Sequence, residues 1–190
     1  MSVTAQQVQH VLKYWADSLI KGKRCLVIAS QEPWQESLLI HYGARHVSTV
    51  ELGEIDSRHP YNRIYTPADF AESHRRGTIQ PFDLVLITAW VQHTGLGRFG
   101  EALEPNGDLF LMRRAMSVMK PGAFGIISIP TGVKDKLIWN RSRVYGPHRL
   151  RYLFGGWDIL ASHPNIESEG ELDQPSAVWI LKNNLACNNT

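Results

Sequence analysis

Hydrophobic positions recur along the chain with two different periods. Apolar side chains spaced three and four residues apart predict an amphipathic helix over residues 4–21. Further helices are expected to begin near Pro33, Thr66, Asn106 and Pro147, where capping residues or proline precede apolar positions. Short apolar runs between them are typical of strands, at residues 24–29, 46–52, 63–66, 82–90, 123–130, 157–162 and 177–182.

Strands and helices therefore alternate, and the strands are apolar throughout. This pattern predicts an α/β fold, a doubly wound and mostly parallel sheet of the Rossmann-like type with helices on both faces. Neither a repeat nor a linker divides the chain, so we expect a single domain over residues 1–190. Open sheets of this kind bind ligands at the carboxyl ends of their strands. Functional residues are expected just after residues 29, 52, 65, 90 and 130.

The segment GLGRFG, residues 95–100, has the letters of a dinucleotide-binding fingerprint. No helix begins within the motif, and the acidic residue expected about 20 positions later is missing. It is therefore interpreted as a glycine-rich loop after the fourth strand. The glycines permit positive φ there, or the loop lies across a ligand and presents His93 and Arg98 to it. A loop of about 16 residues favours the second interpretation, because such long loops are often functional.

Charge and composition narrow the classes of protein. The net charge of +2 gives no strong nucleic-acid signal. A solvated helix face is favoured over a phosphate-binding patch for the densest basic stretch, Arg141, Arg143, Arg149 and Arg151. Neither Cys25 nor Cys187 has the spacing of a metal site, so no metal is expected. No signal-peptide pattern and no apolar run of membrane length is present, which predicts a cytoplasmic protein without membrane contact.

The segments VSTVEL, FDLVLITAWVQH and MKPGAFGIISIP, taken in order, resemble class I S-adenosylmethionine-dependent methyltransferases. The resemblance implies that fold, with an antiparallel C-terminal edge strand, and S-adenosylmethionine as cofactor. It implies contacts of Glu51 with the ribose hydroxyls, of Ser30 and Glu32 with the amino-acid end, and of Thr88 and Ala89 with the sulfonium. Glu32 also fits the first turn of the following helix, where a negative charge is favourable.

A methyl acceptor would then lie under the glycine-rich loop. His93 is the candidate catalytic base, and Gly95, Gly97 and Arg98 are candidate substrate contacts. Trp34, Trp90 and Trp139 fall outside the core-like spacing of the other tryptophans, so they are candidates for a partner surface.

The chain is also similar, over nearly its whole length, to the family called domain of unknown function 268. The resemblance rests on SQEPWQESLLIHYGARHVSTVE, TPADF, FDLVLITAWVQHTGLGRFG, LEPNGD, MKPGAFGIISIP and NRSRVYGPHRL. The resemblance to that family does not imply any particular reaction. Gln92, Phe99 and Asn140–Arg143 stand where its pattern has Glu, Tyr and N-A-H-R.

These departures, and a first-strand loop without glycines at residues 29–34, favour an alternative to methyl transfer. The chain would then be a catalytically inactive methyltransferase-like protein that binds a nucleotide-like, sugar or protein ligand. A further hypothesis assigns a sugar or nucleotide-sugar substrate to Asn140, Arg143, Tyr145 and Arg149, groups that can hold hydroxyls and phosphates. The same side chains could instead bridge the sheet edge to the last helix.

Overall fold

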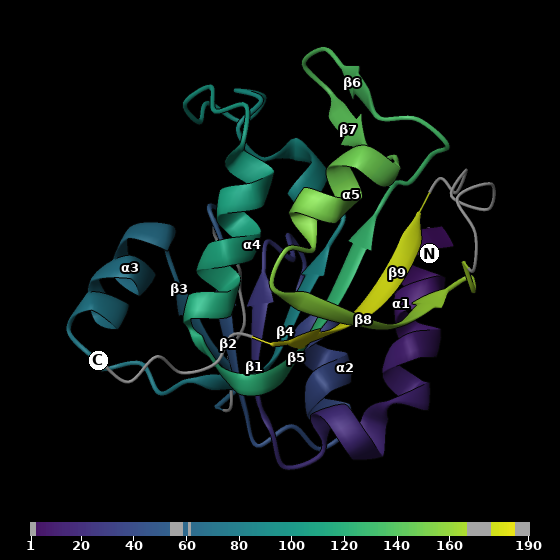
Figure 1. Ribbon diagram of the computed structural model, residues 1–190. Coiled ribbons are helices and arrows are strands. Elements are labelled where there is room, and N and C mark those ends of the chain that lie inside the picture. Colours follow the sequence, from purple (N-terminus) through teal and green to yellow (C-terminus); the bar gives the residue numbers. More distant parts are fainter. Residues whose placement is uncertain (1–2, 54–58, 61, 167–175, 185–190) are drawn as a thin grey trace.

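The computed structural model describes residues 3–53, 59–60, 62–166 and 176–184. Cys187 lies outside these residues. The main sheet has seven strands and carries helices on both faces (Figure 1). Its strands are β1 (Arg24–Ile28), β2 (His46–Val50), β3 (Asn62–Tyr65), β4 (Phe82–Thr88), β5 (Met119–Ile129), β8 (Trp157–His163) and β9 (Ala177–Asn183). The α-helices are α1 (Val3–Tyr14), α2 (Trp34–His41), α3 (Pro67–Arg75), α4 (Gly107–Ser117) and α5 (Pro147–Leu153).

The strand order of the sheet is β3-β2-β1-β4-β5-β9-β8. The first five strands in this order are parallel to one another, whereas β9 runs antiparallel to both β5 and β8. The predicted doubly wound, mostly parallel sheet is confirmed, and so is the antiparallel pairing at its C-terminal edge. The last strand, β9, lies one place in from that edge, and β8 is the edge strand.

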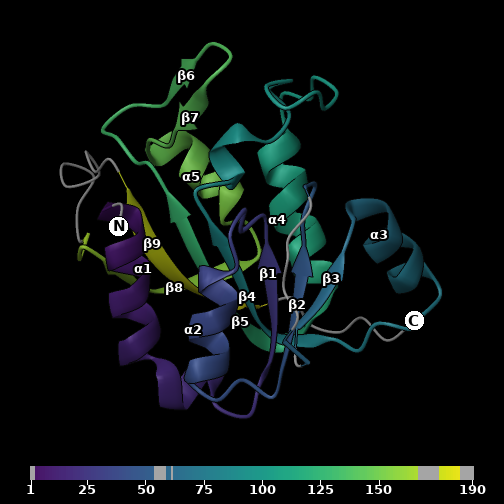
Figure 2. The same cartoon turned by 180° about the vertical axis from the view of Figure 1, so that it is seen from behind.

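Two apolar cores lie on opposite faces of the sheet. Helices α1 and α2 cover one face (Figure 2), and α3, α4 and α5 cover the other (Figure 1). Successive residues of β1 divide between them: Cys25 and Val27 belong to the core under α1 and α2, while Leu26 faces α4. Met112 and Met116 of α4 and Met119 of β5 are all buried in the core under α4. Parallel strands buried on both faces explain the unbroken apolar runs in the sequence.

The structure differs from the sequence-based expectation in two elements. The predicted N-terminal helix is interrupted, because α1 ends at Tyr14 and residues Ala16–Ile20 form a separate π-helical turn. A hairpin of two short strands, β6 (Lys136–Ile138) and β7 (Ser142–Val144), was not predicted. Its strands have three residues each, and β6 is exposed throughout, so no buried face imposes an alternating pattern.

The hairpin corrects the interpretation of the basic stretch as a helix face. Arg141 belongs to the hairpin turn and Arg143 lies in β7, where its side chain is buried. Only Arg149 and Arg151 lie on a helix, α5. The hairpin and the loop between β4 and α4 stand above the carboxyl ends of the parallel strands, at the top of Figure 1. Among the described residues, no helix is long and apolar enough to cross a membrane.

Candidate functional site

A small cavity lies at the carboxyl ends of β1 and β4, where the chain passes to α2 and to the glycine-rich loop. Its volume is about 220 Å³. It is lined by Thr4, Ala5, Ala29, Ser30, Gln31, Trp34, Gln35, Thr88, Ala89 and Trp90. Ser30, Thr88 and Ala89 were predicted from the sequence to contact a cofactor here, and the structure brings these three together. Glu32 and Glu51 do not line the cavity.

The backbone around this cavity is held in a left-handed conformation at three residues that are not glycine. The φ angles are 58° at Ala29, 61° at Gln31 and 52° at Ala89. Side chains disfavour this region, and such strain is concentrated at functional sites in proteins. The first-strand loop therefore has glycine-like φ angles at two positions, although it contains no glycine. The absence of glycine reduces the space next to this loop, because Ala29 and Gln31 carry Cβ atoms that glycine would lack.

Glu51, at the end of β2, fixes this strained loop. One carboxylate oxygen accepts a hydrogen bond from the Gln31 backbone N–H (2.9 Å), and the other accepts one from the Leu52 N–H (2.8 Å). Glu51 is buried, with 6% of its surface exposed. An ionised carboxylate offers about four lone-pair sites, so these two bonds leave acceptor capacity for hydroxyl groups.

A second carboxylate, Glu36, lies beneath the same loop and was missed in the sequence. It sits in the first turn of α2, and its Oε1 accepts hydrogen bonds from the hydroxyls of Ser30 and Thr49, both at 2.8 Å. Glu32, by contrast, precedes α2 and is exposed. The acidic group favourable to the helix dipole is therefore Glu36 and not Glu32. Only the packing of α2 on the sheet distinguishes the two glutamates.

Gln35 is the polar side chain that the cavity leaves unsatisfied. Gln35 is 1% exposed, and its side-chain oxygen Oε1 has no hydrogen-bond partner among the described residues. A buried acceptor without a partner costs about 1–3 kcal/mol. Because Gln35 lines the cavity, a ligand that donates a hydrogen bond there would remove this cost.

The glycine-rich loop is folded around one of its own carboxylates. Gly95, Gly97 and Gly100 have φ angles of 77°, 73° and 84°. The N–H groups of Gly97 and Phe99 donate to the two carboxylate oxygens of Glu101, at 3.0 and 2.9 Å. Desolvation raises the pKa of Glu101, but the backbone donors outweigh it and the net shift of the pKa is downward. The loop thus forms an anion-binding nest, and Glu101 fills it.

His93 follows the end of β4 and faces the hairpin. Its Nδ1 donates a hydrogen bond to the Arg141 carbonyl oxygen, so Nδ1 carries a proton, and in the neutral imidazole Nε2 carries the lone pair. Desolvation lowers the pKa of His93, and Arg98 and Arg141 add to this, whereas the Arg141 carbonyl and Glu101 oppose it. The net shift is downward, which favours a neutral imidazole.

Aromatic rings connect His93 to the cavity. Trp90 lines the cavity and stacks on Phe99 at 5.1 Å between ring centroids, and the edge of the His93 ring approaches both. Arg98 lies over the Phe99 ring and also donates to the Arg141 carbonyl at 3.3 Å. Gln92 is buried and supplies an amide rather than a titratable group.

Asp108, in the first turn of α4, is the centre of a buried charged network. Its carboxylate accepts two hydrogen bonds from Arg149 (2.9 and 2.6 Å) and one from the Tyr145 hydroxyl (3.1 Å), and Arg143 Nε lies 3.7 Å away. Burial and Asp108 raise the pKa of Tyr145 well above its usual value. Arg143 donates further to the carbonyls of Thr94 (2.7 Å) and Pro105 (3.0 Å). Arg143 and Tyr145, predicted as substrate contacts, thus hold the hairpin and α5 onto the start of α4.

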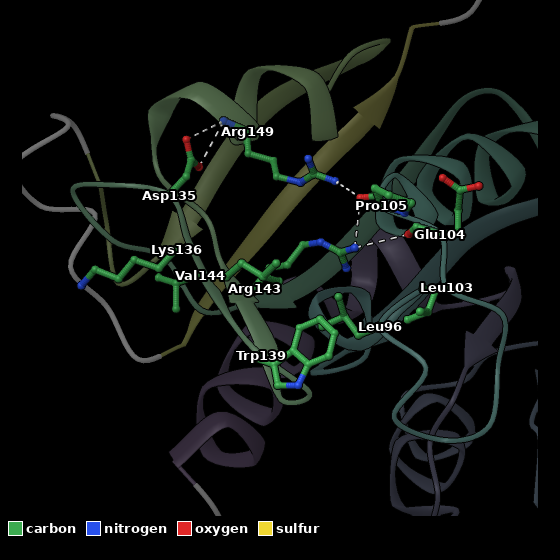
Figure 3. A pocket seen from close by; sticks show the side chains of 12 residues that line it. Leu96, Leu103, Glu104, Pro105, Asp135, Lys136, Trp139, Arg143, Val144 and Arg149 are labelled. Carbon is green, nitrogen blue, oxygen red and sulfur yellow. Dashed lines mark hydrogen bonds between the residues drawn. The ribbon is translucent and has the colours of Figure 1, made fainter.

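A groove of about 550 Å³ separates the glycine-rich loop from the hairpin (Figure 3). It is lined by Gly95, Leu96, Leu103, Glu104, Pro105, Asp135, Lys136, Leu137, Trp139, Arg143, Val144 and Arg149. Gly95 and Arg143 were predicted to contact substrate, but Gly97, Arg98, Asn140 and Tyr145 are not among the lining residues. Asn140 lies at the exposed hairpin turn, with φ 49°. Among the described residues, no group of three His, Cys, Asp or Glu side chains is placed to hold a metal ion.

This strand order, the antiparallel strand beside β5 and the cavity at the ends of β1 and β4 define a class I methyltransferase fold. The chain belongs to the family described as Caenorhabditis protein of unknown function, DUF268, whose model matches residues 22–186. No curated protein matches it in sequence.

Solved structures share the fold at low sequence identity. A putative S-adenosylmethionine-dependent methyltransferase from Streptococcus mutans is 15% identical, with a TM-score of 0.63 over 96% of this chain. This chain spans only 49% of that protein's length. The N-methyltransferase NodS from Bradyrhizobium japonicum, solved with S-adenosylhomocysteine, is 10% identical with a TM-score of 0.62, covering 95% of this chain and 87% of its own. At these identities the likeness establishes the fold alone.

We predict that Gly95→Ala destabilises the protein more than Gly100→Ala. Both substitutions place a side chain at positive φ, which costs about 1–2 kcal/mol. A Cβ at Gly95 would also collide with the Glu104 carbonyl oxygen, whereas one at Gly100 meets nothing within 4 Å. Urea denaturation should therefore show about 1–3 kcal/mol of additional loss for Gly95→Ala. Equal losses for the two variants would contradict the loop geometry.

We also predict that Asp108→Asn lowers the free energy of unfolding by about 3–5 kcal/mol, because it leaves buried arginine charge uncompensated. Asp17→Asn, which removes an exposed pair with Lys21, is the matched control and should change stability little. Urea denaturation of both variants measures the difference. Near-equal midpoints would show that the Asp108 network does not hold this part of the fold together.

Proposed function

We propose that this protein is an S-adenosylmethionine-dependent methyltransferase. The observation that carries the proposal is the cavity at the ends of β1 and β4, with its strained backbone and the unsatisfied Oε1 of Gln35. In an open α/β sheet this edge is the usual ligand site. When bound, S-adenosylmethionine would supply a methyl group to a nucleophilic atom of the acceptor, and the electron pair of the broken bond would stay on sulfur.

The residues present fit the amino-acid end of that cofactor. An ammonium group is a donor only, and Gln35 Oε1 is a buried acceptor without a partner. Ser30 lines the same cavity, and its hydroxyl is already oriented by its bond to Glu36. Thr88 and Ala89 would lie near the sulfonium, and the remaining lone pairs of Glu51 would accept from the ribose hydroxyls. A cavity of about 220 Å³ is below the roughly 300–1,000 Å³ typical of whole-ligand sites, so it accounts for part of the cofactor.

His93 is the proposed general base. Its Nδ1 is fixed by the Arg141 carbonyl, which leaves Nε2 as the atom that accepts a proton from the acceptor. The groove between the glycine-rich loop and the hairpin is the proposed acceptor site, because the hairpin turn both holds Nδ1 of His93 through the Arg141 carbonyl and carries Trp139, which lines the groove. In this arrangement the hairpin orients the base and also forms one wall of the acceptor site.

A catalytically inactive binding protein is the second candidate. It is favoured by the side chains of the first-strand loop, which reduce the space for a cofactor, and by Gln92 and Phe99, which cannot transfer protons. It predicts a ligand other than the cofactor, so cofactor binding separates the two candidates.

We expect the wild type to bind S-adenosylmethionine and S-adenosylhomocysteine with micromolar affinity in calorimetric titrations. Gln35→Leu should bind both about tenfold more weakly, because a ligand hydrogen bond of about 1.4 kcal/mol is lost. The same variant should be as stable as the wild type or more stable, since it removes an unsatisfied buried acceptor. Ser37→Ala, at an exposed position of α2, is the control. No heat at concentrations that reveal millimolar affinity would refute the cofactor assignment and favour the inactive binding protein.

We expect His93 to be neutral at pH 7, with the proton on Nδ1. Burial penalises the imidazolium, so the pKa of His93 lies below the ordinary histidine value. The neutral base form therefore persists to lower pH than in an ordinary histidine. Long-range ¹H–¹⁵N NMR of the imidazole rings reports both the tautomer and the midpoint of titration. A protonated His93 at pH 7, or a proton on Nε2, would exclude it as the base.

A further inference from the structure

We infer that the groove between the glycine-rich loop and the β6–β7 hairpin binds a neutral saccharide, with one sugar ring stacked on Trp139. The inference rests on the proposed function only where it identifies this saccharide as the methyl acceptor. Saccharide binding itself can be measured without any transfer.

Trp139 is the most exposed large apolar side chain of the described residues, at 82%. It directly follows β6, in a hairpin turn that is closed by the Arg141 N–H donating to the Ile138 carbonyl at 3.0 Å. Figure 3 shows its indole ring on the hairpin wall, on the side toward Leu96. Leu137 and Leu103, at 62% and 70% exposure, line the same groove. An exposed apolar group of this kind marks a binding surface.

The charged groups in the groove argue against a phosphorylated or otherwise anionic ligand. Arg143 and Arg149 would resemble a phosphate clamp, but their N–H groups already donate to Asp108 and to the carbonyls of Thr94 and Pro105. Figure 3 shows both side chains directed toward Pro105 and away from Trp139. Neither arginine is thus available as a free clamp for a phosphate group.

The rest of the lining also opposes a purely apolar ligand. Glu104, Asp135 and Lys136 contribute to the walls, and an apolar ligand would desolvate these charges without any compensation. Asp135 is already fixed, because its carboxylate accepts hydrogen bonds from the backbone N–H groups of Gly146 and Arg149. A pre-oriented carboxylate of this kind suits a hydroxyl donor.

A neutral saccharide matches both features of the groove. A pyranose ring has a face of C–H groups, which carries partial positive charge and packs on the negative face of an indole. The hydroxyls of a saccharide can donate to the carboxylates that line the groove, those of Glu104 and Asp135, and accept from Lys136. The volume of about 550 Å³ lies within the range of ligand sites, roughly 300–1,000 Å³.

The test is saturation-transfer NMR on the full chain with neutral methyl glycosides of the common hexoses, deoxyhexoses and pentoses. Glucose 1-phosphate and an uncharged apolar peptide are the comparison probes. We expect at least one neutral glycoside to bind and Trp139→Ala to weaken its binding about tenfold. Tyr14→Ala removes a side chain of similar exposure, 77%, from α1 and should leave binding unchanged. Circular dichroism of both variants checks that they remain folded.

Three results would overturn the inference. The first is no binding of any neutral glycoside at millimolar sensitivity, and the second is preferential binding of the phosphate or the peptide. The third is glycoside binding that Trp139→Ala leaves intact. Calorimetry of the same samples with S-adenosylhomocysteine keeps the two proposals separate. Glycoside binding without cofactor binding would leave the saccharide site standing and refute the methyltransferase, and the reverse result would refute only the saccharide site.

Discussion

The packing of the β6–β7 hairpin and α5 on the start of α4 depends on one fully buried carboxylate, that of Asp108. A charge with no exposed surface is tolerated only where partners and hydrogen bonds compensate its desolvation. Here the three partners lie close together in the chain: Arg143 is in β7, Tyr145 directly follows that strand and Arg149 is in α5. The position of Asp108 in the first turn of α4 adds the favourable interaction of a negative charge with a helix N-terminus. This single group therefore ties the hairpin and α5 to the start of α4, while Arg143 also donates to the Thr94 carbonyl beside the glycine-rich loop, and these contacts fix the groove.

At this edge of the sheet, two further carboxylates also accept hydrogen bonds from the chain's own backbone. Glu101 fills the nest that the glycines form, and Glu51 is bonded to the strained loop after β1. Motifs that suggest phosphate binding, a glycine-rich loop and a cluster of arginines, are thus satisfied within the chain. What remains open to a ligand is the unsatisfied Gln35 beside the cavity and the exposed Trp139 beside the groove.

The fold was largely predictable from the sequence, because strands buried on both faces leave continuous apolar runs and helices leave a period near 3.6. The hairpin was not, since its strands have only three residues each, β6 is exposed throughout and the buried residue of β7 is an arginine, so neither strand carries such a pattern. Ser30, Thr88 and Ala89 were placed correctly at the cavity by their positions after β1 and within the end of β4. Gln35 and Glu36 were missed, because only the packing of α2 shows which side of its first turn is buried. Arg143 and Tyr145 were predicted as ligand contacts because such groups can hold hydroxyls and phosphates. Their bonding to Asp108 could not be predicted, because Asp108 lies more than 30 residues away in sequence.

A crystal structure of the protein soaked with S-adenosylhomocysteine tests the central claim most directly. The account predicts density for the ligand at the carboxyl ends of β1 and β4, with its ammonium group within hydrogen-bond distance of Gln35 Oε1. Density at another place in the molecule, or a cavity that stays closed at saturating ligand, would contradict it.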